Sequence, residues 1–321
     1  LASEGADPRM LISQQEIGAL PRLGDETLRA VQRLPGAAGN GISGLAAIRG
    51  GEPGETLILL DGVQLFEPFH LKNFFSPVSL LDSRMMAEMD VYSGGFNARY
   101  GTRISAVVDA KSIRPQADRY YELGASLFHT NALASHRFAD GDGQLLISGR
   151  RSNLDQVAEA VNSDFGEPRY FDAFSRLDYA LSPATRVSAN YLGSRDKITA
   201  RRPSRGESAH TEYRNNYAWV SVEHDWSDYA TTRAIGSFTD VTNIRSGRID
   251  QIGRIAGSVD DERAFHIASL QLDGTIEMAR FLNIWGVTAK QLSANYDYRS
   301  DVRFETGYPF VGSPANDSHR A

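Results

Sequence analysis

The sequence contains no cysteine. Disulfide bonds, thiolate metal sites and thiol catalysis are therefore excluded, and zinc ribbons and iron–sulfur clusters are excluded with them. The seven histidines show no paired ligand spacing such as HxxxH, and no GxSxG, HExxH or paired-carboxylate signature occurs. We therefore expect no protein-bound metal, no cofactor and no enzymatic activity.

A large excess of charge of one sign is also missing. Lysine and arginine number 34 and aspartate and glutamate 40, which gives a net charge of −6 without a long block of either sign. Proteins that bind nucleic acid carry clustered positive charge. Nucleic acid is therefore not an expected partner.

Long hydrophobic runs are absent. The longest uninterrupted run of leucine and isoleucine is Leu57–Leu60, far short of the roughly 18–20 residues that a membrane-spanning helix needs. A hydrophilic average does not exclude a membrane β-barrel, because only alternate residues of each strand face lipid. The sequence begins at Leu1 without a signal-peptide pattern, so we expect any export signal to lie outside it.

Residues 1–117 have the pattern of a small α+β domain. A short helix is expected at residues 25–34, because Asp25 can cap it and Leu28 and Val31 fall on one face. Asp61–Gly62 lies between two apolar runs and predicts a tight turn between strands. The expected strands cover residues 56–60, 63–66 and 87–92, and a helical turn is expected at residues 80–85.

Residues 118–321 have a different pattern, in which apolar and polar side chains alternate over stretches of about ten residues. In YYELGASLF, Tyr121, Leu123 and Leu127 fall on one face and Glu122 falls on the other. The same alternation returns in RVSANYLGS (186–194) and AWVSVEHDW (218–226). The pattern predicts about nine antiparallel transmembrane β-barrel strands of about 9–11 residues each.

The connections between these strands are expected to be of two kinds. Short turns at residues 140–143, 182–185 and 227–230 alternate with long segments at residues 153–169, 197–213 and 243–260, as the two rims of an outer-membrane barrel require. Tyr179, Trp226 and Tyr229 lie beside the short turns, where aromatic rings mark a membrane interface. A soluble β-sandwich with aromatic strand ends is the alternative explanation.

Nine strands cannot close a bacterial barrel without an unpaired edge, and unpaired edges are not tolerated in lipid. We therefore expect a truncated chain that forms a partial barrel.

Two segments of the first domain carry a family resemblance. LPGAAGNGISGLAAIRGGEPGETLILLDGVQLFEPFH contains an LPG element, an IRG strand and a DGV hairpin in that order, and MDVYSGGFNARYGTRISAVVDAKS follows with a glycine pair, a Tyr-Gly and an apolar strand. In this order the motifs resemble the plug of TonB-dependent outer-membrane receptors. FDAFSRLDYALSPATRVSANYLGSRD is similar to early barrel strands of the same family.

The resemblance implies a plug domain at residues 1–117 and the N-terminal part of the transmembrane β-barrel at residues 118–321. No energy-coupling segment is recognisable before Leu20 and no aromatic strand ends the sequence. We expect both elements to lie outside this chain or to be degenerate.

The resemblance also implies a set of plug motif residues that shape turns and gate the barrel. These are Arg49, Gly50, Gly51, Asp61, Gly62, Gly94, Gly95, Arg99, Tyr100, Gly101 and Arg103. Arg49 and Arg99 are expected either to form ion pairs with lumen-facing carboxylates such as Glu122 or Asp178, or to remain solvated. Asp61 is expected to serve its turn by accepting backbone hydrogen bonds.

In the resembling family the loop after the DGV hairpin lies at the plug apex and faces the incoming solute. The corresponding residues are Gln64, Phe66, Glu67, Phe69, His70, Lys72 and Asn73. Their aromatic rings either stack on a solute or pack against the barrel wall. If they contact the solute, alanine at Phe69 and His70 weakens ligand binding while the plug stays folded.

The function implied by the resemblance is active uptake of a scarce solute, siderophore-bound iron or similar, across the outer membrane of a Gram-negative bacterium. The implied partners are a TonB-type energy-transducing protein in the periplasm, a small-molecule or metal-chelate ligand, and outer-membrane lipid and lipopolysaccharide. A passive porin or adhesin barrel and a soluble periplasmic β-rich protein are the alternatives.

Overall fold

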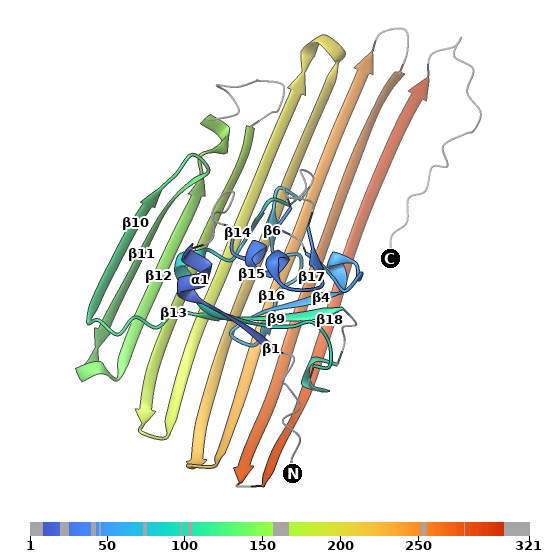
Figure 1. Ribbon diagram of the computed structural model, residues 1–321. Helices are drawn as coiled ribbons and strands as arrows, with labels where there is room; N and C mark the ends of the chain where they lie inside the picture. The colour runs from blue at the N-terminus through green and yellow to red at the C-terminus, as the bar shows by residue number, and fades with distance from the viewer. Residues whose placement is uncertain are drawn as a thin grey trace.

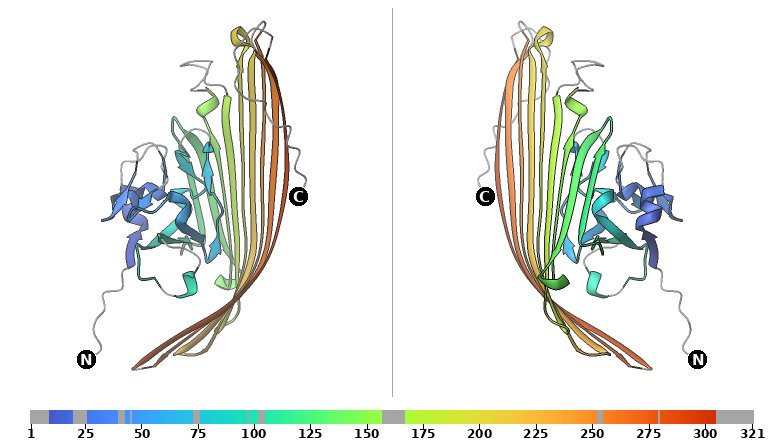
Figure 2. Two further views of the ribbon diagram at one scale, coloured as in Figure 1. Left: turned by 90° about the vertical axis from the view of Figure 1, so that its right-hand side faces the viewer. Right: turned by 90° about the vertical axis from the view of Figure 1, so that its left-hand side faces the viewer.

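The computed structural model describes residues 9–19, 26–39, 43–44, 46–72, 76–96, 98–101, 105–156, 167–251, 255–278 and 280–304 (Figure 1). A small domain of short elements precedes a large antiparallel sheet. In the two side views the small domain lies on the concave face of the curved sheet (Figure 2). We call the sheet face that contacts the small domain the inner face and the opposite one the outer face.

The small domain is built on a five-stranded sheet with the order β1-β8-β9-β4-β5, in which only β4 and β9 run parallel. Its strands and helices are β1 (Arg9–Ser13), α1 (Gln14–Ala19), η2 (Leu28–Arg33), β2 (Ala37–Ala38), β3 (Ala47–Ile48), η3 (Pro53–Glu55), β4 (Thr56–Leu60), β5 (Val63–Gln64), β6 (Phe69–His70), β7 (Val78–Ser79), η5 (Ser83–Met85), β8 (Met86–Tyr92), η6 (Ala98–Tyr100) and β9 (Ala106–Ser112). The α+β prediction is therefore confirmed.

The details of this domain differ from the predictions in two places. The expected helix is a 3-10 helix that begins at Leu28, with Leu28 and Val31 buried as predicted, whereas Asp25 lies outside the described residues. Strand β5 ends at Gln64 instead of residue 66. The reason is that the backbone N–H and C=O of Phe66 both bond to the hydroxyl of Tyr217 in the large sheet, at 3.1 and 2.9 Å.

The Asp61–Gly62 turn has the predicted form. Asp61 has φ 49° and Gly62 has φ 86°, and two positive φ angles in a two-residue turn match the twist of a hairpin. The turn joins β4 to β5, as predicted.

The large sheet contains nine strands in sequential order, each antiparallel to its neighbours. They are β10 (Arg119–Ala125), β11 (His129–Phe138), β12 (Gly143–Ser152), β13 (Glu167–Ser182), β14 (Thr185–Arg202), β15 (Glu207–Ser227), β16 (Ala230–Gln251), β17 (Ile255–Met278) and β18 (Phe281–Phe304). Within the described residues β10 and β18 are its edges. The nine predicted strands are thus present as an open, partial barrel.

The short turns are confirmed, and β11 and β12 have the predicted length with 10 residues each. The predicted lengths of the later strands and two of the three long loops, at residues 197–213 and 243–260, are wrong. The pairs Ser182/Thr185 and Ser227/Ala230 close tight turns, whereas β13 to β18 have 16 to 24 residues. Most of residues 197–213 and of residues 243–260 belong to strands, and only the short helix η9 (Pro203–Arg205) and Gly206 separate β14 from β15. Their polar side chains do not prevent the backbone ladder from continuing, and membrane thickness limits only the part of a strand that lies in lipid.

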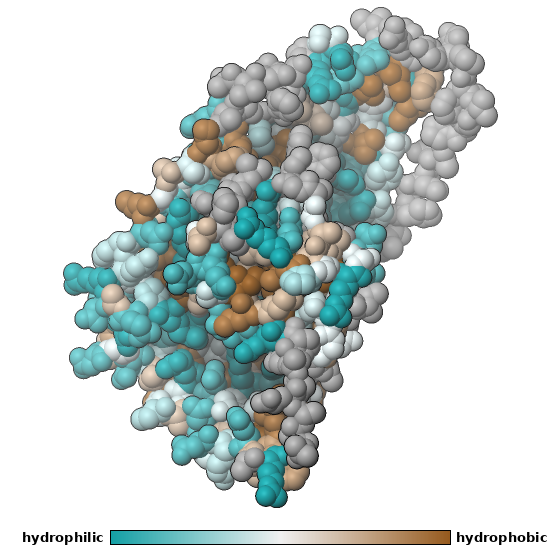
Figure 3. All heavy atoms as spheres, in the orientation of Figure 1, coloured by the Kyte–Doolittle hydropathy of each residue, from teal (hydrophilic) through white to brown (hydrophobic). Residues whose placement is uncertain are grey.

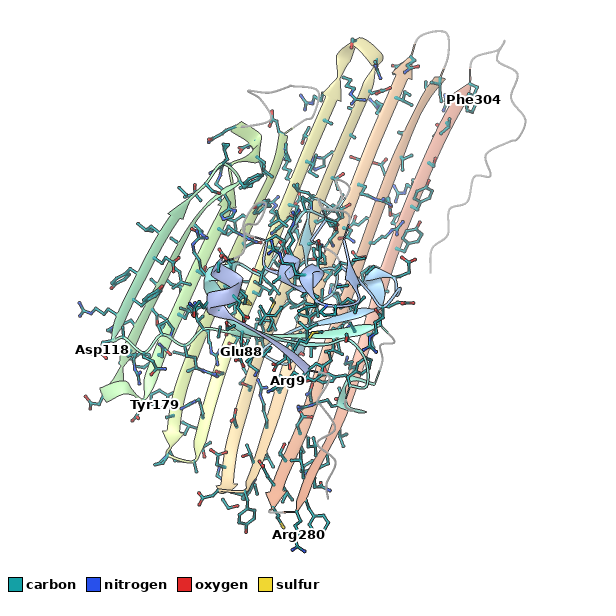
Figure 4. The ribbon with its side chains drawn as sticks, in the orientation of Figure 1. Arg9, Glu88, Asp118, Tyr179, Arg280 and Phe304 are labelled. Atoms are coloured by element: carbon teal, nitrogen blue, oxygen red, sulfur yellow. The ribbon has the colours of Figure 1, made fainter. Side chains whose placement is uncertain are left out.

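Side chains alternate between the two faces as predicted. Leu123, Val220 and Phe238 are exposed on the outer face, at 84%, 49% and 50%, whereas Trp219 and Ser221 point inward and are buried. Asp118, Tyr179 and Arg280 lie at the end of the sheet that carries the short turns, and Phe304 lies at the opposite end (Figure 4). Hydrophilic residues predominate on the side of the small domain, with hydrophobic residues gathered near its centre (Figure 3).

One hydrophobic core runs from the small domain into the large sheet. It joins Leu60 and Met89 of the small domain to Leu146, Phe174 and other residues of the inner face. The two units therefore share buried apolar surface in addition to the polar contacts described below.

Replacement of a core leucine tests this packing. Leu60 is fully buried, so Leu60→Ala is expected to destabilise the small domain by about 2–5 kcal/mol. Hydrogen exchange of the β4 and β9 amides measures the change. Leu11→Ala is the matched control because Leu11 is 49% exposed, and equal effects of the two substitutions would contradict the core described here.

Candidate functional site

The β6–β7 hairpin of the small domain is fastened to the large sheet through His70. The ring Nδ1 of His70 lies 2.5 Å from Oδ1 of Asp196 in β14, and its Nε2 lies 2.8 Å from Oδ1 of Asp172 in β13. The backbone N–H of Leu71 donates to Oδ2 of Asp196 at 2.9 Å. His70 is completely buried, so both of its nitrogens are committed to the sheet.

A third strand holds the other half of the same hairpin. Arg150 of β12 donates from Nε to Oδ2 of Asp172 at 2.7 Å and from a terminal nitrogen to the carbonyl oxygen of Ser79 at 2.6 Å. The ring of Tyr170 stacks on His70 with 4.1 Å between ring centroids. We call His70, Arg150, Asp172 and Asp196 the hairpin clasp.

The charge state of His70 follows from this geometry. Burial alone would lower the pKa of the imidazole, but the carboxylates of Asp172 and Asp196 outweigh it and raise the pKa from 6.5 to about 9. At neutral pH the clasp therefore contains two cations and two carboxylates.

Asp61 forms a second polar contact with the large sheet. Its carboxylate accepts bonds from the N–H and hydroxyl of Ser112 at 3.1 and 2.7 Å, and it lies 3.6 Å from Arg176 of β13. The carbonyl oxygen of Asp61 accepts a bond from Arg233 of β16 at 2.8 Å. Burial raises the pKa of the Asp61 carboxyl, and the bonds from Ser112 oppose that rise. Asp61 therefore accepts a backbone hydrogen bond as expected, but from Ser112 of β9 and not from its own turn, and it links the small domain to β13 and β16.

Near β10 and β11, a third contact joins the helix η5 and its N-cap residue Asp82 to the large sheet. Arg84 lies 2.9 Å from Glu122 of β10, and Asn131 of β11 donates to Asp82 at 3.1 Å. Glu122 is thus paired across the contact as the sequence suggested, but its partner is Arg84 instead of Arg49 or Arg99.

The two arginines singled out from the sequence behave differently. Arg99 lies 3.4 Å from Asp273 of β17 and so forms the expected kind of ion pair. The guanidinium of Arg49 instead lies against Gly94 of its own domain, within 2.5 Å of the place where a Cβ would stand. Gly94 also has φ +152°, so this position requires glycine. Asp178 is paired with Arg176 and Arg114, at 2.6 and 3.5 Å.

A cavity of about 540 Å³ opens between the loop after β5 and the inner face of β15 to β17. The small domain contributes Phe66, Glu67, Phe69 and Lys72 to its lining, and the sheet contributes Tyr213, Asn243, Arg245 and Arg263. Nζ of Lys72 lies 5.0 Å from the ring centre of Tyr213 and 3.1 Å from Glu67. The cavity therefore offers cationic and aromatic groups from both units, and we call it the apex cavity.

A neighbouring cavity of about 410 Å³ contains more of the motif residues. Gly62, Gln64, Phe66, Arg99, Tyr100 and Gly101 line it together with residues of β16 to β18. Nζ of Lys290 in β18 donates to the amide oxygen of Gln64 at 3.2 Å. Gly50 (φ 76°) and Gly95 (φ 62°) shape turns, as their positive φ angles require, and Gly51 follows the first of these turns.

Two of the expected apex residues are enclosed between the small domain and the sheet, as the alternative of packing against the barrel wall implies. The side chain of His70 is enclosed in the hairpin clasp, and that of Phe69 is 4% exposed and belongs to the hydrophobic core. Alanine at either position therefore removes a structural contact, so the test with these two substitutions cannot separate ligand binding from folding. Asn73 and Arg103 lie outside the described residues.

The sequence predicts the loop but not its partners in the sheet. Asp172 and Asp196 are inward residues of alternating strands, as are many other polar residues of the same strands. The signal available in the sequence was their even-numbered position along alternating strands, which assigns them to the inner face. The register that brings them to His70 is a long-range property.

Among the described residues, no group of three or more histidine, aspartate or glutamate side chains is arranged to hold a metal ion. None of the helices in the described ranges is long and apolar enough to cross a membrane.

Comparison with known proteins agrees with this architecture. Residues 4–108 match the family model of the TonB-dependent receptor plug domain. The small domain is a TonB-dependent receptor plug domain. Comparison with curated proteins gives no significant match.

Three solved structures are similar to the chain as a whole. They are a variant of the ferric enterobactin receptor PfeA from Pseudomonas aeruginosa (TM-score 0.54, 13% identity, 93% of this chain and 60% of that one), the siderophore receptor PirA from Acinetobacter baumannii (0.56, 12%, 94% and 59%) and the ferric citrate transporter FecA (0.59, 16%, 96% and 50%). The shared feature is the fold, a plug domain followed by part of a barrel. The chain spans half to three-fifths of the length of these receptors.

The hairpin clasp predicts a pH-dependent attachment of the plug domain. Because the pKa of His70 is raised from 6.5 to about 9, its contribution, on the order of 3 kcal/mol, is complete below pH 6.5 and is lost as the pH rises through about 9. Hydrogen exchange of the β6–β7 amides, corrected for intrinsic rates, should therefore accelerate between pH 7 and pH 10.

His70→Gln is expected to exchange fast at every pH, because a neutral amide cannot balance two buried carboxylates. His266→Gln is the control, since His266 lies on the outer face and pairs with Asp240 at 3.2 Å. A wild-type protein with pH-independent protection of β6–β7 would contradict the assignment.

Proposed function

We propose that this protein is a TonB-dependent receptor that imports a scarce solute, a siderophore–iron chelate or a similar ligand, across the outer membrane of a Gram-negative bacterium. In this proposal residues 1–117 act as the plug and residues 118–321 form the first part of the barrel. A TonB-type protein in the periplasm supplies the energy. The protein performs no chemistry on the solute.

The observation that carries the proposal is the way the plug domain is seated on the inner face of the sheet. Ion pairs and hydrogen bonds to β10, β11, β12, β13, β14, β16 and β17 hold it there. A passive pore has no use for a separate domain fastened across its wall. Polar contacts suit a gating domain because water can form hydrogen bonds with the same groups when the domain moves away from the sheet.

The outer face supports a membrane location. Leu123, Trp226 and Phe281 are 84%, 68% and 74% exposed there, and a soluble protein rarely exposes a continuous apolar surface of this kind. Trp226 and Tyr229 lie beside a short turn, where aromatic rings form an interfacial girdle. In the alternative of a soluble β-rich protein, nothing would cover these exposed apolar residues of the outer face.

We assign solute binding to the apex cavity. Lys72, Arg245 and Arg263 bring cationic groups to its lining, and Tyr213 and Phe66 bring aromatic rings. Such a lining suits an anionic or aromatic chelate. The motif residues Gln64, Arg99, Tyr100 and Gly101 line the neighbouring cavity, which we assign to the path of the solute once the plug moves.

Uptake assays test the transport function. A strain that lacks the gene, grown under iron limitation and supplied with a panel of radiolabelled iron chelates, is expected to lose uptake of one class and to regain it from the intact full-length gene. Loss of the TonB protein should abolish the same uptake. Unchanged uptake of every chelate in the deletion strain would contradict the proposal as applied to iron.

Substitution of cavity residues separates binding from folding. Lys72→Ala together with Arg245→Ala is expected to weaken binding of the transported chelate about tenfold or more, since each removes a charged contact worth about 1.5–3 kcal/mol. Calorimetry on the purified receptor measures the affinity. Arg299→Ala, on the outer face of β18, is the control, and equal affinities for both variants would move the binding site elsewhere.

Plug movement can be tested because the chain has no native cysteine. Arg84 and Glu122 form an ion pair across the contact at 2.9 Å and lie outside the apex cavity. Arg84→Cys with Glu122→Cys, joined by a short thiol cross-linker, is expected to retain solute binding and to lose uptake, whereas each single variant retains both. Full uptake by the cross-linked receptor would show that this part of the plug stays in place during transport.

A further inference from the structure

A group of basic side chains lies on the outer face of β12 to β15. It lies next to the exposed apolar residues of that face, which we call the apolar band, on the side away from the short turns. Arg151, Arg169, Arg195, Lys197 and Arg214 are all exposed there. Alternation fixes their orientation, because Arg151 follows the inward Arg150, Arg169 precedes the inward Tyr170, and Arg195 precedes the inward Asp196. These cations therefore stand behind the hairpin clasp, on the other side of the same strands.

Strand register places these side chains in two adjacent rows. Arg151 pairs with Phe171, Phe171 with Arg195, and Arg195 with Arg214, whereas Arg169 pairs with Lys197 and Lys197 with Glu212 in the next row. With neighbouring strands about 4.8 Å apart, the first row spans about 14 Å. We call this group the outer arginine rows.

Two carboxylates organise the arginines in pairs. Asp155 lies 2.9 Å from Arg151 and 3.1 Å from Arg169, and Glu212 lies 2.8 Å from Arg195 and 2.5 Å from Arg214. Both carboxylates are nearly covered, while the four arginine side chains remain 48–58% exposed. Each carboxylate thus fixes two guanidinium groups side by side and leaves donors facing outward.

Among the residues that the structure describes, positive charge exceeds negative charge in this region. The five cations face three carboxylates, Asp155, Glu212 and Glu167, the last of which is exposed and lies 3.1 Å from Arg169. Arg195 and Arg214 also stand directly opposite each other, an arrangement of like charges that ordinarily destabilises a sheet. Farther along the sheet, the row that contains Lys197 continues with Glu262 of β17 and Asp297 of β18.

The apolar band continues up to these rows. Tyr191 and Phe171 are 39% and 52% exposed on the outer face, and Ile147, Leu177 and Val220, nearer the short turns, are exposed on the same face. Cations immediately beyond an apolar band lie at the depth of lipid headgroups. Guanidinium groups bind phosphate through two parallel donors, which a lysine cannot do.

We propose that the outer arginine rows bind the phosphorylated headgroup of lipopolysaccharide in the outer leaflet, at a site shared by β12, β13, β14 and β15. The spread of the cations over four strands fits a headgroup with two phosphates better than a phospholipid with one. The inference rests on the proposed outer-membrane location but not on solute transport.

The test uses the purified full-length receptor and measures binding of diphosphoryl lipid A by native mass spectrometry and by competition in detergent. Arg195→Glu with Arg214→Glu is expected to lower this affinity at least about tenfold. Monophosphoryl lipid A and phosphatidylglycerol should bind to the wild type more weakly than diphosphoryl lipid A does. The charge-reversed variant should reduce the affinity for these two lipids less than the affinity for diphosphoryl lipid A.

Arg299→Glu with Arg303→Glu is the matched control. Both arginines lie on β18 next to carboxylates, Asp297 at 2.8 Å and Asp301 at 3.0 Å, and the charge change is the same. Only protein with the heat-dependent gel mobility of a folded barrel is compared, and Arg195→Gln with Arg214→Gln provides a milder variant with an expected intermediate loss.

Two outcomes would overturn the inference: equal lipid A affinity in the charge-reversed variant and the control, or equal binding of phosphatidylglycerol and diphosphoryl lipid A by the wild type. Solute uptake is measured in parallel. A receptor that binds lipid A at this site but imports nothing would contradict the proposed function and leave the lipid site in place.

Discussion

The position of the plug domain depends on one constraint, that charges taken out of water must be paired. His70 and Arg150 are fully buried, and Asp172 and Asp196 nearly so. Removing one member leaves an uncompensated buried charge, which costs about 3–5 kcal/mol. The four groups therefore keep one arrangement. Because His70 comes from the plug and the other three from the sheet, that arrangement fixes where the β6–β7 hairpin lies.

The same strands serve two environments because successive side chains point to opposite faces. Arg150 belongs to the hairpin clasp and Arg151 to the outer arginine rows, although they are neighbours in sequence. Asp196 and Arg195 are divided in the same way. This alternation is a local property of strands. It explains why the sequence predicted the two faces of the sheet, the short turns and the number of strands correctly.

The predictions that failed depend on contacts between residues far apart in the sequence or on the surrounding membrane. The expected strand length came from the thickness of a bilayer, but the ladder from Lys197 and Glu212 to Arg202 and Glu207 continues through polar residues, and nothing in the local pattern marks the point where lipid ends. The partners of His70 were also out of reach, since they are separated from it by 102 and 126 positions. The role of Arg99 was predicted from its charge, whereas Arg49 occupies a turn with φ 51° and contacts Gly94.

The loop that lines the apex cavity is attached at both ends to the sheet. At one end the backbone of Phe66 bonds to Tyr217, and at the other the N–H of Leu71 donates to Asp196. Lys72, whose side chain faces the cavity, is the next residue after Leu71. In the proposed function, contacts of the solute with Lys72 act next to the bond between Leu71 and Asp196, and Asp196 also pairs with His70. Because that cluster lies in a water-poor region, a small displacement changes its energy far more than it would change an exposed ion pair. The hairpin clasp is thus the element through which occupation of the cavity would alter the attachment of the plug.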